Sequence, residues 1–333
     1  MNTDLIQFIK TTTGATEICG EESLQSLWSG YGEILRLQLQ GGSVPSVVVK
    51  CIQTQPVAEH PRGWNTDTSH QRKLKSYQVE VEWYRRWAGE CGSGPRVAHC
   101  YGVLSNQALT VIVLEDLDNS GFALRKSHLT LAQVQVCLRW LADFHGRFLQ
   151  RSPVGLWSVG SYWHLATRPD EYRAMADGPL KSAADKIDDA LNNAQYQTLV
   201  HGDAKVANFC FSAQADAVVA VDFQYVGGGC GIKDMAYLMG SCLTERECAQ
   251  WQDQCLAVYF QQLRATVAAE QRAAEDIDMN ALEDEWRCLY AVAWADFQRF
   301  LLGWMPSHKK VNAYSKDMTQ RALEYLSGES GKK

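Results

Sequence analysis

The residues best suited to chemistry lie in the stretch from Thr198 to Asp234, TLVHGDAKVANFCFSAQADAVVAVDFQYVGGGCGIKD. Asp203 and Asn208 lie close together, and Asp222 follows after two apolar runs, NFCF and AVVAVDF, that are separated by the turn-forming residues SAQAD. Strands joined by a short turn return to the same place, so a hairpin here would bring both carboxylates and the amide to one end of a two-stranded ribbon. Such a set of oxygen ligands suits Mg²⁺ and its bound phosphates.

Each position in this pattern has a chemical reason if the reaction is phosphoryl transfer. The order H-x-D-x-x-x-x-N followed by D-F is the arrangement that kinases use. Asp203 would accept a hydrogen bond from the acceptor hydroxyl and take its proton as the oxygen attacks the γ-phosphorus. Asn208 and Asp222 would give a neutral and a charged oxygen to the metal. Lys205 would offset the charge of the transferring group.

The same residues have a structural alternative. Asp and Asn often form turns between buried strands, and an HGD tripeptide alone would favour that interpretation. The complete spacing, with Lys205 and a second carboxylate beyond an apolar strand, favours the catalytic interpretation.

HGDAKVAN together with VDFQ resembles the kinase-like phosphotransferases that act on small molecules: the aminoglycoside phosphotransferases, the choline kinases and the ecdysteroid kinase-like proteins. These families carry HGD where protein kinases usually carry HRD. The resemblance runs from about Trp28 into the C-terminal helices, and VGGGCGIKDMAYLM is most similar to the ecdysteroid kinase-like and related bacterial branches. The chain departs from many small-molecule kinases at Lys205, where protein kinases keep a catalytic-loop lysine.

The resemblance implies a protein-kinase-like, α+β fold with two lobes. A small antiparallel-sheet lobe would span residues 1–115 and a large helical lobe residues 116–333. ATP would lie in the cleft between them with Mg²⁺, and the hydroxyl of a small-molecule alcohol would accept the γ-phosphate. Asp234 would accept main-chain hydrogen bonds from the catalytic loop, and His145 in LADFHGRF would support that loop by hydrogen bonding.

The pattern of the first lobe predicts a hairpin, because GEILRLQLQ alternates apolar and polar residues, GGS turns the chain and SVVVKCI returns. Lys50 ends the run VVVK and matches the kinase lysine that holds the α- and β-phosphates. Its acidic partner is expected on the next helix, KLKSYQVEVEWYRRWAG. Helical spacing puts Glu80 on the aromatic side and Glu82 beside Arg86, which favours Glu80 because a carboxylate on a packed face needs a partner. Glu82 stays open as the alternative.

Three further segments have expected roles around a nucleotide. ALTVIVLEDL ends in an acidic, glycine-containing connector that fits a hinge, where main-chain groups around Glu115 and Leu117 would face the adenine edge. The turn Trp28–Gly32 could cover the phosphates, although it contains no G-x-G-x-x-G. The polar, proline-containing stretch from Gln53 to Lys75 predicts a long loop. Its Arg and Lys residues could contact phosphate, but charges in a loop are more often simply solvated.

Aromatic residues upstream of the catalytic loop could form a wall for the acceptor. Trp157, Tyr162 and Trp163 would suit an apolar or ringed alcohol, with core packing as the alternative. Trp294 and Trp304 could also close the pocket, although the apolar stripe that they share with their helix is mostly core. The bend between DFQ and Asp234 is short, which argues against a protein acceptor.

Composition excludes several other classes. A net charge of −6 argues against a nucleic-acid binder. The absence of a signal-like segment or a long apolar run predicts a cytoplasmic protein with no membrane association. The eleven cysteines form no C-x-x-C pair, so they indicate neither a disulfide framework nor a zinc site. A nucleotide-binding pseudokinase and a protein kinase stay as alternatives, and the sequence leaves the acceptor and the oligomeric state open.

Overall fold

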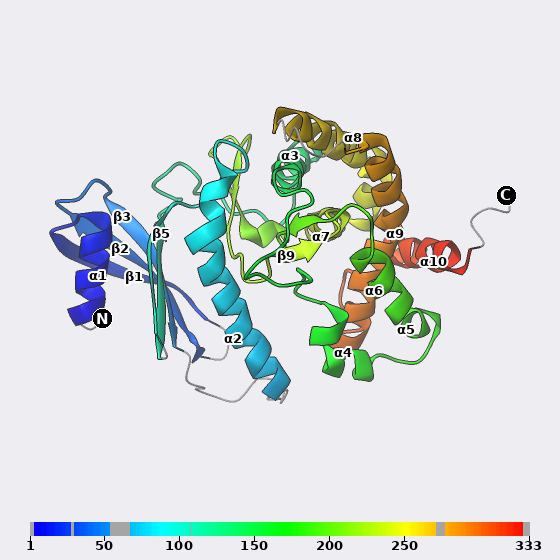
Figure 1. Ribbon diagram of the computed structural model, residues 1–333, viewed down its shortest axis with the longest axis horizontal. Coiled ribbons are helices and arrows are strands. Elements are labelled where there is room, and N and C mark those ends of the chain that lie inside the picture. The colour runs from blue at the N-terminus through cyan, green and yellow to red at the C-terminus, as the bar shows by residue number, and fades with distance from the viewer. Residues whose placement is uncertain (1–2, 28–29, 54–66, 107, 271–276, 329–333) are drawn as a thin grey trace.

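The computed structural model describes residues 3–27, 30–53, 67–106, 108–270 and 277–328. A five-stranded antiparallel sheet forms one end of the molecule and helices form most of the rest (Figure 1). The strands follow the order β1-β2-β3-β5-β4. They are β1 (Glu17–Ser26), β2 (Gly32–Gln40), β3 (Ser46–Gln53), β4 (Cys100–Ser105) and β5 (Leu109–Glu115). The predicted hairpin is therefore confirmed as β2–β3, and β5 lies within ALTVIVLEDL, directly before the expected hinge.

Side-chain alternation along β3 decides which residues face the cleft. Helix α1 (Thr3–Thr13) covers one face of the sheet, where Val47 and Val49 join its apolar cluster. Helix α2 (Asp67–Glu82) lies on the other face, and Lys50 points that way because successive strand residues alternate between faces. The strand period thus turns a lysine within an otherwise apolar strand toward α2.

The loop expectation for this end of the molecule was wrong in part, and two of its elements, α1 and β1, were not predicted. The loop predicted from Gln53 to Lys75 already becomes helical at Asp67, and residues 54–66 lie outside the described part of the chain. Helix α1 and strand β1 carry no strong pattern, since most residues of β1 are exposed at the sheet edge. Helix α2 continues into a π-helical turn, Trp83–Trp87, and a 3₁₀ turn, Ala88–Cys91.

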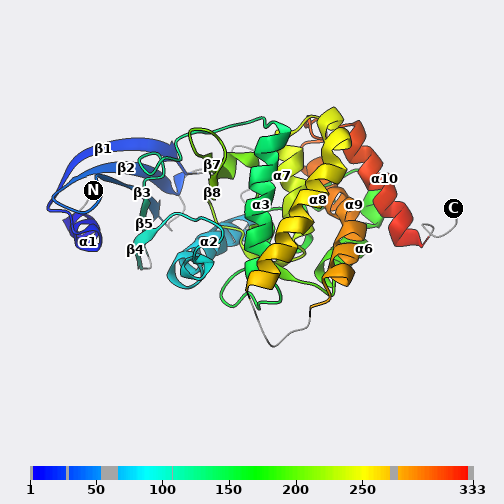
Figure 2. The same ribbon diagram turned by 90° about the horizontal axis from the view of Figure 1, so that it is seen from above.

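The helical part of the molecule supports the catalytic segments (Figure 2). Its helices are α3 (Leu131–Arg147), α4 (Pro169–Ala174), α5 (Pro179–Ser182), α6 (Ala184–Asn192), α7 (Ile232–Cys242), α8 (Glu245–Ala269), α9 (Met279–Trp304) and α10 (Ala313–Ser327). A capping box formed by Thr130 and Gln133 begins α3. None of the described helices is both long and apolar enough to cross a lipid bilayer.

Two small ribbons carry the chemistry-bearing stretch. Strand β6 (Thr198–Val200) pairs with β9 (Gly227–Gly229), and β7 (Phe209–Phe211) pairs with β8 (Val218–Ala220), both antiparallel. The short 3₁₀ turn η5 (Val206–Asn208) connects the HGD loop to β7, and another, η4 (Leu165–Thr167), precedes α4. The catalytic stretch therefore folds as the predicted β7–β8 hairpin, which lies in the sequence between the paired strands β6 and β9.

Candidate active site

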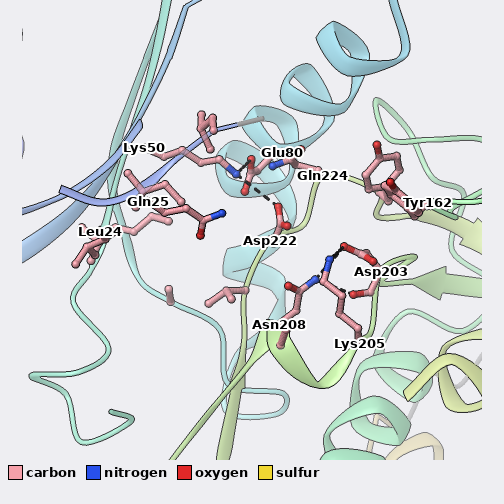
Figure 3. A pocket seen from close by; sticks show the side chains of 18 of the residues that line it. Leu24, Gln25, Lys50, Glu80, Tyr162, Asp203, Lys205, Asn208, Asp222 and Gln224 are labelled. Carbon is pink, nitrogen blue, oxygen red and sulfur yellow. Dashed lines mark hydrogen bonds and ion pairs between the residues drawn. The ribbon is translucent and has the colours of Figure 1, made fainter. Parts of the chain in front are cut away.

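The β7–β8 hairpin brings Asp222 back to Asn208. The N–H of Val221 donates to the carbonyl of Asn208 at 2.9 Å, so the residue before Asp222 is fixed beside η5. The amide nitrogen of Asn208 donates to the Asp203 carbonyl at 2.7 Å and to its Oδ2 at 3.1 Å. Lys205 Nζ donates to the same Oδ2 at 2.8 Å (Figure 3). The structure thus gathers all four predicted side chains at one point.

Two carboxylate oxygens in this cluster lack a donor. Asp203 Oδ1 and Asp222 Oδ1 are both buried and have no donor in good hydrogen-bond geometry within the described residues, although the Tyr237 hydroxyl lies near the Asp203 carboxylate. Asp222 Oδ1 does lie 3.5 Å from Lys50 Nζ, at ion-pair distance. Buried carboxylate oxygens normally find donors or cations, because desolvating them is costly. The two oxygens therefore fit a site that binds a hydroxyl at one and a cation at the other.

The backbone and charge state of Asp222 suit such a role. Its φ of +67° lies in the left-handed region that residues other than glycine seldom adopt. Burial raises the pKa of Asp222, but the positive charges of Lys50, Lys205 and Lys73 outweigh it and hold the pKa below its ordinary value. The side chain is therefore a carboxylate at neutral pH.

The glycine of HGD is required by a close approach. Gly202 has a φ of +76°, and a Cβ there would lie 2.2 Å from the carbonyl oxygen of Tyr225. The Asp234 carboxylate accepts the N–H groups of His201 at 2.5 Å and Gly202 at 3.0 Å. His145 Nε2 lies 3.2 Å from the same carboxylate. These contacts confirm the expected hydrogen bonding of Asp234 and His145 around the loop.

Histidine 201 connects the loop to the following hairpin. The N–H of Asp203 donates to His201 Nδ1 at 3.3 Å, and His201 Nε2 lies 3.0 Å from the carbonyl oxygen of Val221. These partners assign the proton to Nε2. His201 thus holds the geometry of the loop.

Lys50 pairs with Glu80 rather than Glu82. Lys50 Nζ lies 2.7 Å from Glu80 Oε2, and the two side chains are 7% and 2% exposed. Glu82 instead forms an ion pair with Arg86 at 3.0 Å on the same helix. Burial lowers the pKa of Lys50, but Glu80 and Asp222 more than offset this and keep the lysine charged. The structure thus confirms that Glu80, and not Glu82, is the acidic partner of Lys50.

Helix α2 and the π-helical turn that follows it both contact the DFQ segment. Trp83 stacks on Phe223 with ring centres 4.4 Å apart. Lys73 Nζ donates to the side-chain carbonyl of Gln224 at 2.9 Å, and burial lowers the pKa of Lys73 to about 8. The sequence did not single out Lys73, because it fell in the predicted loop. Its spacing of about two helical turns from Glu80 is the signal that could have found it.

The connector after β5 has a defined hydrogen-bond pattern. The Glu115 carboxylate pairs with Arg96 and accepts the N–H of His99 at 3.0 Å. The main-chain N–H of Glu115 donates to the His99 carbonyl at 2.8 Å, and the Leu117 carbonyl accepts the N–H of Phe122 at 2.8 Å. Because the Glu115 N–H and the Leu117 carbonyl already have these partners, the expected contacts with the adenine edge would have to come from the Glu115 carbonyl and the Leu117 N–H.

The candidate residues all line one cavity of about 1010 Å³ between the sheet and the catalytic loop. They are Lys50, Glu80, Glu115, Leu117, Asp203, Lys205, Asn208 and Asp222. Tyr31, from the turn proposed to cover phosphates, also lines it, while Trp28 and Ser29 lie outside the described residues. Across the described ranges, no three His, Cys, Asp or Glu side chains form a metal cluster by themselves. Oxygens from a bound phosphate chain would thus have to complete the coordination of a Mg²⁺ ion.

The aromatic candidates divide between the cavity and the core. Tyr162 and Trp304 line the cavity. Trp163 is 1% exposed and its indole N–H donates to Asp296 at 2.9 Å, so it belongs to the core. Trp294 is also buried in the core, and Trp157 stacks behind the cavity wall on Tyr225.

Comparisons with known proteins agree with this geometry. The ecdysteroid kinase-like family is matched over residues 70–149 and 166–271. Similar solved structures include an aminoglycoside phosphotransferase candidate from Ralstonia eutropha JMP134, with 15% identity, 98% coverage of both chains and a TM-score of 0.56. Choline kinase from Cryptosporidium parvum Iowa II has 10% identity, covers 99% of this chain and 96% of its own, and gives a TM-score of 0.52. A search of curated proteins finds no significant match. The fold is therefore protein-kinase-like.

Proposed function

We propose, on the premise that this chain belongs to the ecdysteroid kinase-like family, that it transfers the γ-phosphate of ATP to a hydroxyl of a small molecule. The observation that carries this proposal is the orientation of Asp203. Lys205 and Asn208 both bind its Oδ2, so its buried Oδ1 is left to accept the hydroxyl proton of the acceptor. A base held in place by two donors needs no reorganisation when the acceptor arrives.

The remaining residues would hold the nucleotide. Lys50, fixed by Glu80, would bind the α- and β-phosphates, and the Glu115 carbonyl and Leu117 N–H would meet the adenine edge. Asp222 and the side-chain oxygen of Asn208 would hold Mg²⁺, which offsets the charge of the phosphates. Lys205 would balance charge on the transferring group once Asp203 takes the proton.

The path of the chain after DFQ supports a small acceptor. Strand β9 pairs with β6 directly after this segment, and α7 begins at Ile232. Protein kinases use a long segment at this point to dock peptides, and the short connection here leaves little chain for that purpose.

All eleven cysteines are unpaired, which supports a reducing, cytoplasmic location.

The test is an Asp203→Asn variant assayed for ADP release with a panel of hydroxylated metabolites. The substitution is nearly isosteric, so the variant should keep the thermal shift that Mg·ATP gives to the wild type. Turnover should fall about 10²–10⁴-fold, the usual contribution of a positioned base. Wild-type turnover in the variant would refute the assignment of the base. Absence of any Mg·ATP thermal shift in the wild-type protein would refute the function itself.

A further inference from the structure

Two guanidinium groups line the acceptor side of the cavity, and the proposed function gives neither a role. Arg72 comes from α2, and Arg168 lies between η4 and α4. Arg72 Nη1 donates to the carbonyl of Thr167 at 2.7 Å, next in sequence to Arg168. This bond brings the first half of α2, and its positive charge, to the segment that carries the second arginine.

Tyr162 connects Arg168 to the loop that carries the proposed base, Asp203. The N–H of Tyr162 donates to the carbonyl of Gly202 at 2.8 Å, directly before Asp203. Arg168 Nε donates to the Tyr162 carbonyl at 2.7 Å, and the guanidinium lies 4.1 Å from the centre of the Tyr162 ring. Figure 3 shows Tyr162 on the same side of the cavity as Asp203. A molecule with a hydroxyl at Asp203 would therefore extend past Tyr162 toward Arg168.

The charges at this place do not balance. Within the described ranges, the one ion pair of these two guanidiniums is that of Arg168 with Glu171, at 3.2 Å. Burial and the like charge of Arg168 lower the pKa of Arg72. Arginine side chains nevertheless stay charged in proteins. Among the described residues, Arg72 therefore has no acidic side chain at ion-pair distance, and Glu171 is the one carboxylate whose charge acts on both arginines.

Arg168 also has an unused donor. Its side chain is 5% exposed, and Nη2 is buried without a hydrogen-bond partner among the described residues. A buried N–H of a charged group that donates to nothing is costly, and the cost is relieved when an anion binds. Arginine is the residue best suited to bind planar carboxylates and phosphates.

We propose that the acceptor is an alcohol that also carries an oxyanion, either a carboxylate or a phosphate. Arg168 and Arg72 bind the oxyanion while the hydroxyl lies at Asp203, and Tyr162 and Trp304 contact the carbon skeleton. This proposal rests on the proposed function and adds the charge of its substrate. The same two arginines disfavour polycationic and quaternary ammonium acceptors.

The test compares acceptors that share a scaffold and differ in charge. One series is 4-hydroxyphenylacetate, 2-(4-hydroxyphenyl)ethanol and tyramine, which are anionic, neutral and cationic. A second series is glycerate, glycerol 3-phosphate and glycerol, which separates carboxylate from phosphate. Binding is measured calorimetrically with Mg²⁺ and a non-hydrolysable ATP analogue, so the comparison does not depend on turnover. We expect an anionic member to bind at least about tenfold more tightly than its neutral partner.

Variants then connect the preference to the two arginines. Arg72→Gln and Arg168→Gln should each remove most of the preference for the anion and leave the affinity for the ATP analogue unchanged. Arg72 is the less buried of the two, so its variant covers the case in which Arg168→Gln does not fold. Arg173→Gln, on the exposed side of α4, is the matched control and should keep the preference.

The outcomes separate this proposal from the proposed function. If no anionic member of either series binds more tightly than its neutral partner, or if the preference survives in both variants, the anionic acceptor is refuted. Failure of the wild type to bind the ATP analogue would instead count against the kinase assignment.

Discussion

Replacing Glu80 by glutamine would test how the nucleotide half of the site is held. The change removes a charge that is 2% exposed and lies 2.7 Å from Lys50 Nζ, itself 7% exposed. Breaking a buried ion pair on one side usually costs about 3–5 kcal/mol. Two features reduce this cost, because the new amide can still accept a hydrogen bond and Asp222 remains 3.5 Å away as a counter-charge. We expect a loss of about 2 kcal/mol, or roughly 30-fold in the ratio of folded to unfolded protein.

The same substitution should also weaken nucleotide binding. Without Glu80, the nearest carboxylate to Lys50 is Asp222, and the lysine should move toward it. Lys50 and Asp222 would then bind each other, and this ion pair would compete with the binding of Lys50 to the phosphates and of Asp222 to Mg²⁺. We expect the KM for ATP to rise about tenfold, because pre-organisation of the lysine is lost. Urea unfolding gives the stability, and steady-state kinetics with a coupled ADP assay gives the KM.

Glu82→Gln is the matched control on the same helix. Its partner Arg86 is 61% exposed, so the ion pair should contribute at most about 0.5 kcal/mol. Equal destabilisation by the two variants would refute the distinction between a buried and a surface pair. A Glu80→Gln protein with unchanged stability and unchanged KM would refute the positioning role of Glu80.

Three further predictions concern the metal, the pH dependence and the catalytic loop. Asp222→Asn should remove the Mg²⁺-dependent part of the thermal shift with ATP. It should also lower the melting temperature of the free protein slightly, because asparagine tolerates a positive φ but loses the attraction to Lys50, Lys205 and Lys73 that keeps the pKa of the carboxyl low. A Mg²⁺-dependent shift as large as in the wild type would contradict the metal-binding role. Lys73, with a pKa of about 8, is charged below that pH and neutral above it. The KM for ATP should therefore rise as the pH passes through 8 in the wild type and stay level in Lys73→Met. Matching pH profiles of the two proteins would exclude a contribution of Lys73 to phosphate binding. Asp234→Asn should lower kcat more than it raises the KM for ATP, because Asp234 accepts two N–H groups of the HGD loop but does not line the cavity. A change in the KM alone would contradict that role.

The catalytic half of the site could be predicted from sequence because its geometry is local. Asp203, Lys205 and Asn208 lie within one loop and one 3₁₀ turn, and a short hairpin returns Asp222 to them. Nothing distant along the chain is needed to place them. The choice of Glu80 over Glu82 was also local, since helical periodicity alone separates the packed face from the exposed one.

The acceptor half could not be predicted in the same way. The first turns of α2 are polar because they face the cavity and solvent, and polar residues after two prolines have the composition of a loop. Arg72 therefore carried no helical signal. Arg168 lies in an aromatic stretch where only its tertiary contacts with Tyr162 and Glu171 distinguish it from a surface arginine. The division of the tryptophans between core and cavity likewise depends on packing that spacing does not encode.

The two halves of the site are held by different means, and this difference has a consequence for binding order. Asp203 is held by donors from its own loop, Lys205 and Asn208. Lys50 is held by Glu80 of α2, and this helix contacts the DFQ segment through Lys73 and, in the turn that follows it, Trp83. Helix α2 carries Glu80, Lys73 and also Arg72, which belongs to the proposed anion site. A nucleotide whose phosphates attract Lys50 and Lys73 therefore acts on the same helix that holds part of the anion site. If the two sites share α2 in this way, Mg·ATP analogue should change the affinity for an anionic acceptor, and the acceptor must change the affinity for the analogue by the same factor. Calorimetric titrations in both orders measure the two factors, and independent binding in either order would show that α2 does not couple them.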